Sequence, residues 1–198
     1  NSLVPHGVNP QEDFVMPTFA TPLSRAKVEQ LMQPALIRVI DNIRKQLDVS
    51  DWQGGYEETL IWPEGTTPEQ QQEYAALQKV LHGVPPEEHD RVSGLMSQLP
   101  QPKPLYTLRL KKSDQPDCTI DIWALCYQVC AVNLVSASEV EASVALRCDD
   151  QSPPISEAAY EQLEADVSLF DEDGDVDWRL LDDKTKMLVQ GLFQRLPK

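Results

Sequence analysis

The stretch Cys118–Val135 constrains the fold more than any other part of the chain, because water can face very little of it. From residue 120 onward only three of its residues are polar, namely Asp121, Gln128 and Asn133. A two-residue alternation up to about Trp123 is followed by apolar residues at helical spacing. This change of period predicts a strand that runs into a buried helix ending near Val135. A single helix from Thr119 is the alternative.

Segments with strand periodicity and segments with helical periodicity alternate along the rest of the chain. Leu105–Lys112 alternates apolar and polar residues, and turn-forming residues join it to Cys118, which predicts an antiparallel hairpin. Further strands are predicted at 56–62 and 140–148, and a small acidic hairpin at 167–178. Helices are predicted at 24–47, 67–83, 85–99 and 156–164, with a last helix that ends at Pro197. We therefore expect an α+β fold, in which an antiparallel sheet packs against helices.

The length of 198 residues fits one domain, which we place at 21–198. Residues 1–20 contain three prolines and no periodicity, so we expect a flexible N-terminal segment. Residues 2–7, SLVPHG, resemble a protease-site linker from an expression vector. Residues 1–15 are then either foreign or native, and Met16 is the natural start in the first case.

The charge of the chain limits the classes of molecule that it can bind. The formal net charge of −15 at pH 7 repels a phosphate backbone, so we exclude nucleic acid as the main partner. Acidic residues concentrate at 149–183, where thirteen Asp and Glu stand against one Arg, whereas 24–47 has an excess of bases. No apolar stretch reaches the roughly 18 residues of a membrane span, and we see no signal sequence. We expect a soluble, cytoplasmic protein without membrane contact, although a basic amphipathic helix at 24–47 leaves peripheral membrane association as an alternative.

The four cysteines are too few for a disulfide scaffold. Cys126 and Cys130 lie inside the apolar stretch, so we expect all four to be reduced thiols. Cys118 and Cys148 lie at the ends of predicted strands, and a redox role for them is the alternative. A zinc site is disfavoured because the chain has no CxxC pair.

The acidic run at 171–177 is the nearest approach to a metal motif. An EF-hand loop needs oxygen ligands at positions 1, 3, 5 and 12 and glycine at position 6. With Gly174 at position 6, Leu169 and Leu180 fall at positions 1 and 12, so the register fails at both ends. An exposed turn is the better interpretation. The weak candidates for a looser cation site are Asp171, Asp173, Asp175 and Asp177.

Nothing in the sequence matches a catalytic or cofactor signature. The histidines that could serve as a general base, His82 and His89, lie in polar helices. We find no GxSxG, no phosphate-binding glycine loop and no HExxH. We therefore expect no cofactor and no enzymatic activity. Trp52 and Trp178 each follow an acid at an element boundary, and exposed tryptophans often anchor interfaces. Trp52, Trp178 and Asp177 are therefore the candidate partner-binding residues, although both rings could instead cover core edges.

Three stretches, Asp51–Pro68, Thr119–Cys130 and Asp175–Lys198, resemble a family of small uncharacterised proteins from cyanobacteria. The resemblance covers most of the chain from Met16 onward. It implies no activity and no functional residues. It implies only a cytoplasmic setting, or the stromal-type face of a photosynthetic membrane.

Our leading hypothesis is a non-enzymatic accessory protein that assembles or regulates another protein by binding it. It depends on the missing catalytic motifs, the uneven charge and the boundary tryptophans. The alternative from another class is a small-molecule-binding domain or enzyme with its site between the sheet and the helices.

Overall fold

The computed structural model describes residues 17–132, 145–148 and 161–198, which form two compact units. One unit comprises residues 59–104, and the other comprises the described residues of 17–58 and 105–198. Residues 1–16 of the predicted flexible segment 1–20, most of the predicted strand 140–148 and most of the predicted helix 156–164 lie outside the described residues. Within the described part of that segment, Phe19 forms a β-bridge with Leu163. The expectation of one domain at 21–198 stays a prediction.

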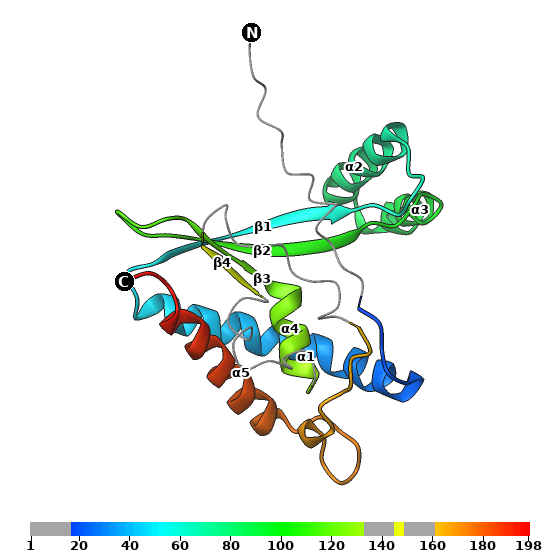
Figure 1. The fold of residues 1–198 in the computed structure, drawn as a ribbon. Helices are drawn as coiled ribbons and strands as arrows, with labels where there is room; N and C mark the ends of the chain where they lie inside the picture. Colours follow the sequence, from blue (N-terminus) through cyan, green and yellow to red (C-terminus); the bar gives the residue numbers. More distant parts are fainter. Residues whose placement is uncertain (1–16, 133–144, 149–160) are drawn as a thin grey trace. The chain divides into compact units, whose positions relative to one another are not determined.

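A four-stranded antiparallel sheet runs in the order β1-β2-β3-β4 (Figure 1). Its strands are β1 (Gln53–Ile61), β2 (Lys103–Lys111), β3 (Cys118–Asp121) and β4 (Leu146–Cys148). In the β2–β3 hairpin, Leu108 lies opposite Ile120 and Leu110 lies opposite Cys118. The structure thereby confirms the α+β class and the predicted hairpin.

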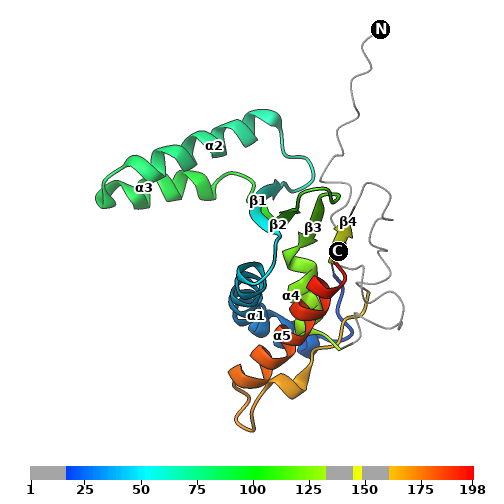
Figure 2. The same cartoon turned by 90° about the vertical axis from the view of Figure 1, so that its left-hand side faces the viewer.

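One face of this sheet carries the core of the larger unit. Leu108, Leu110, Cys118 and Ile120 are fully buried, whereas Arg109 on the opposite face is exposed. The helices α1 (Pro22–Asp48), α4 (Ile122–Cys130) and α5 (Trp178–Gln194) lie together on the buried face (Figures 1 and 2). Their apolar side chains and those of the sheet form one contiguous cluster.

β1 begins earlier than predicted, at residue 53, where the sequence indicated a turn. The reason is Gly54, since a Cβ atom there would lie 2.8 Å from Leu47 Cδ1 and 3.1 Å from Leu108 Cδ1. The missing side chain lets the strand pass close to both leucines.

The strand-to-helix change inside the Cys118–Val135 stretch is confirmed. Asp121 ends β3 and caps α4, and its Oδ1 accepts a hydrogen bond from Ala124 N at 3.1 Å. A single helix from Thr119 is therefore wrong. The helix also ends at Cys130, before the predicted end, because Ala131 forms a bridge with Ala165 instead.

α1 is one continuous helix that contains Pro34, although a proline inside a helix removes one backbone hydrogen bond. Its apolar face is buried, which supplies the packing that holds the helix together. Four of its five bases form ion pairs with acids, namely Arg25, Arg38, Arg44 and Lys45. Lys45 and Arg44 contact Asp41 at 2.7 and 3.0 Å.

The predicted acidic hairpin is only partly formed. A 3-10 turn, η2 (Val167–Leu169), replaces its first strand, and a single bridge joins Phe170 to Val176. The loop between them contacts α1, where Lys27 Nζ lies 4.2 Å from the centroid of the Phe170 ring. The last predicted helix is confirmed as α5.

The smaller unit contains α2 (Pro68–Gly83) and α3 (Pro86–Ser97), as predicted. Thr67 and Gln70 form a capping box at the start of α2. α2 has no buried residue and α3 has only Val92, so this unit has little core of its own. Over the described ranges of the chain, no helix combines the length and the apolarity that crossing a bilayer requires.

The prediction of four reduced thiols is wrong for two of them. Cys118 and Cys148 form a disulfide, while Cys126 and Cys130 are free and buried. The two bonded residues face each other across β3 and β4 in a non-hydrogen-bonded pair, with Cα atoms 4.1 Å apart. Pairing over a separation of 30 residues depends on strand register, which sequence spacing does not reveal.

Candidate functional site

The structure places the predicted partner-binding residues in two different environments. Trp52 is only 7% exposed and belongs to the core cluster, so it is not available as an interface anchor. Trp178 is 51% exposed at the start of α5 and remains accessible. Asp177 caps α5, and its Oδ1 accepts hydrogen bonds from Arg179 N and Leu180 N, both at 3.1 Å. The side chain of Asp177 therefore serves first as the N-terminal cap of α5.

The acidic run forms a turn that its own first residue organises. Asp171 Oδ1 accepts hydrogen bonds from Asp173 N at 3.0 Å and Asp175 N at 2.9 Å. Gly174 adopts a positive φ of 84°, which a tight turn requires. Among the described residues, Asp171, Asp173, Asp175 and Asp177 included, no group of three acids, histidines or cysteines is placed to hold a metal ion.

The two described histidines are engaged by their own helical unit. His82 Nδ1 lies 2.6 Å from Gln78 O, and His89 Nε2 lies 3.1 Å from Val84 O. The free thiols are also poor nucleophiles. Burial raises the pKa of the Cys126 thiol well above its usual range and that of Cys130 to about 12, although nearby Lys184 acts in the opposite direction at Cys130.

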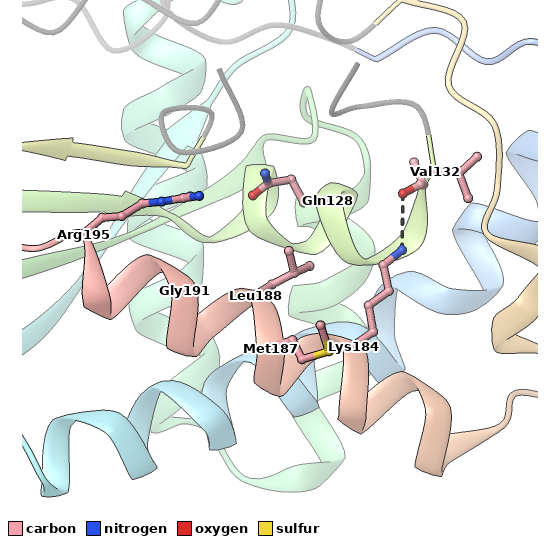
Figure 3. Close-up of a pocket in the computed structure, with 8 residues that line it drawn as sticks. Gln128, Val132, Lys184, Met187, Leu188, Gly191 and Arg195 are labelled. Atoms are coloured by element: carbon pink, nitrogen blue, oxygen red, sulfur yellow. Dashed lines mark hydrogen bonds between the residues drawn. The ribbon is translucent and has the colours of Figure 1, made fainter. Parts of the chain in front are cut away.

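A groove between α4 and α5 brings together residues that the sequence analysis did not single out (Figure 3). Its volume is about 350 Å³. Leu188 and Met187 of α5 lie between the two cations Arg195 and Lys184, and the amide of Gln128 faces them from α4 (Figure 3). The residues that line this α4–α5 groove are Gln128, Ala131, Val132, Lys184, Met187, Leu188, Gly191 and Arg195.

The α4–α5 groove is open to solvent along its rim. Met187 is 73% exposed and Val132 is 53% exposed, so both side chains present apolar surface to solvent at this groove. A Cβ atom built on Gly191 would meet no other atom within 4 Å. No residue that the structure describes therefore fills the space above this part of α5.

The two cations of the groove differ in how they are paired. Lys184 Nζ lies 2.7 Å from Asp166 Oδ2 and 3.4 Å from Ala131 O. Asp166 also accepts hydrogen bonds from Ser168 N and Oγ. Burial raises the pKa of the Asp166 carboxyl, but these hydrogen bonds outweigh burial and the net pKa lies below its usual value. Arg195 has no such acid beside it within the described residues.

The sequence does carry a signal for this groove. Lys184, Leu188, Gly191 and Arg195 are spaced four, three and four residues apart, so they share one face of α5. That face adjoins the one that contributes Leu181, Val189 and Leu192 to the core. Only the position of α4 shows that the neighbouring face lines a groove.

Two other hollows on the described surface have fewer features of a binding site. One, of about 350 Å³, lies on β1 and β2, where Glu57 and Arg109 already form an ion pair at 3.3 Å. The other, of about 430 Å³, belongs to the smaller unit and is lined by the loop 61–66 and Gln71.

Comparison of the chain with protein-family models, with curated proteins and with solved structures gave no match.

Proposed function

We propose that this protein is a non-enzymatic accessory factor that binds another protein, and that the α4–α5 groove is its binding surface. One observation carries the proposal: the exposed apolar side chains of Met187 and Val132 border a space beside Gly191 that no described residue fills. Such a combination of an apolar patch with a polar rim is typical of interaction sites.

The shape of the groove supports a protein partner over a small molecule. Enclosed ligand pockets usually exceed ~300 Å³ and bury most of their ligand. This groove is near the lower limit and is open along Met187 and Val132. It can accept one or two side chains of an opposing protein surface. The raised thiol pKa values and the engaged histidines favour the non-enzymatic interpretation.

A substitution that fills the groove tests the proposal. Gly191→Leu places a side chain in the empty space, and leucine is the better helix former by roughly 0.8–1 kcal/mol, so the fold should be kept. We expect affinity capture from a native cell lysate, quantified by mass spectrometry, to show one specific partner lost from this variant. The control is Gly94→Leu in α3, where added atoms also meet nothing. Equal capture by wild type and Gly191→Leu would exclude the groove as the binding surface.

The cytoplasmic location is part of the proposal, and the disulfide weighs against it. Disulfides are rare where thiols are kept reduced. Trapping of thiols in acid-quenched native cells, followed by mass spectrometry, gives the state of Cys118 and Cys148. A reduced pair fits the cytoplasm, whereas a fully oxidised pair indicates an oxidising compartment.

A further inference from the structure

We infer that the α4–α5 groove binds a protein segment in which an apolar side chain lies close to a carboxylate, and that Arg195 receives this carboxylate. The inference rests on the proposed function and adds the chemistry of the partner. It depends on the charges of the groove, on the shape of its middle and on the difference between its two cations.

The middle of the groove selects for an apolar side chain. Leu188 and Met187 offer apolar surface on α5, and Val132, in the segment that follows α4, offers it at the Lys184 end of the groove (Figure 3). Covering exposed apolar area contributes about 25 cal/mol for each Å² removed from water. Gly191 leaves the space in which such a side chain fits.

The ends of the groove select for negative charge. Lys184 and Arg195 stand at its two ends, with Leu188 between them (Figure 3). Lys184 is already neutralised by Asp166, whereas Arg195 is exposed and its guanidinium has no hydrogen bond or ion pair to any residue that the structure describes. Arg195 is therefore the cation available to a ligand.

An arginine is suited to this task because its planar guanidinium can donate two parallel hydrogen bonds to one carboxylate. In this acidic chain, a single arginine whose side chain has no partner among the described residues has a larger effect on which segments bind than it would have in a basic protein. The chain as a whole carries a net charge of −15, so the general field repels an acidic segment. A local cation beside apolar surface restricts binding to segments that present both features together.

Defined peptides test the inference. We would measure by fluorescence anisotropy the binding of a labelled peptide of leucine, alanine and glutamate, and of its counterpart with lysine at every glutamate position. We expect the acidic peptide to bind wild type about tenfold or more tightly than the basic one, a ratio equivalent to about 1.4 kcal/mol. Raising the salt concentration should weaken the binding of the acidic peptide, because salt screens its solvent-exposed contact with Arg195.

A charge reversal identifies the residue that sets this preference. Arg195→Glu should lower the affinity for the acidic peptide by about tenfold or more and should raise the affinity for the basic peptide. The matched control is Arg179→Glu, the same charge change at an exposed residue of α5 outside the groove, and it should change neither affinity by more than about twofold. Far-UV circular dichroism verifies that both variants keep their helices.

The possible outcomes separate this inference from the proposed function. If both peptides bind equally and Gly191→Leu abolishes both, the groove is a binding site and the inference about charge is wrong. If neither peptide binds, the inference is also wrong, and lysate capture by Gly191→Leu decides the proposed function independently. If sedimentation shows a dimer that Gly191→Leu dissociates, a second copy of this chain is the occupant and the inference is overturned.

Discussion

Lys184 lines the α4–α5 groove and also forms an ion pair that stabilises the fold around it. Its ammonium group closes one end of the α4–α5 groove and holds Asp166, which is 12% exposed, against the end of α4. Asp166 N in turn donates a hydrogen bond to Cys130 O at 2.8 Å. The ion pair therefore fixes the segment after residue 160 against α4, and it leaves Arg195 as the residue free to bind a ligand.

We expect Asp166→Asn to lower the free energy of unfolding at pH 7 by about 1.5 kcal/mol, because hydrogen bonds to a charged group are lost. The pH dependence follows from the lowered pKa of Asp166 in the folded protein. Its contribution is fully present above the unfolded pKa of about 3.9 and is lost as the pH falls through the folded pKa. Urea unfolding at pH 7 and at lower pH should therefore show the difference between wild type and variant shrinking towards acid.

The matched control is Glu29→Gln, which breaks the exposed pair with Arg25 and should change stability by less than about 0.5 kcal/mol. Asp41, whose pKa is held at about 2 by Lys45 and Arg44, titrates in both proteins and cancels from the difference. A difference that stays constant down to pH 2 would mean that the carboxylate of Asp166 does not stabilise the fold as an ion.

Two secondary-structure elements, α5 and β4, are each stabilised by a single interaction near one end: a helix cap in α5 and a disulfide in β4. α5 begins at the side chain of Asp177, so this residue, a weak candidate for a cation site and a candidate partner-binding residue in the sequence, is a helix cap. β4 is three residues long and, among the described strands, pairs only with β3, to which the Cys118–Cys148 bond also joins it.

Asp177→Ala should destabilise the protein by about 1 kcal/mol, whereas Asp177→Asn should restore most of the loss because asparagine caps equally well. Asp175→Ala is the control, since its side chain caps nothing. Chemical denaturation followed by circular dichroism measures all three. If Asp177→Asn were as destabilising as Asp177→Ala, the negative charge rather than the cap would be the feature that matters.

Reducing the disulfide should lower the free energy of unfolding by about 3–4 kcal/mol, given a loop of 30 residues. The double variant Cys118→Ala, Cys148→Ala should resemble the reduced protein. Alkylation of the unreduced, denatured protein should modify Cys126 and Cys130 only. Modification of all four cysteines, or an unfolding curve insensitive to reduction, would contradict the pairing.

For the whole molecule, periodicity predicts the elements but not what lies between them. The strand-to-helix change at Asp121 and the helices of the smaller unit are predicted because each depends on local sequence. The Cys118–Cys148 bond, the burial of Trp52 and the α4–α5 groove are not, because each depends on segments distant in sequence. The face of α5 that includes Gly191 is visible in the sequence, but its open space is not.

The central claim is that another protein occupies the α4–α5 groove, and site-specific photocrosslinking tests it most directly. A photoreactive residue at Met187 would be compared with one at Leu23, which is similarly exposed but lies on α1 outside the groove. We predict a discrete crosslinked partner from position 187 alone, which excess unlabelled wild-type protein suppresses and Gly191→Leu protein does not. Identical products from both positions, or equal suppression by both competitors, would contradict the account.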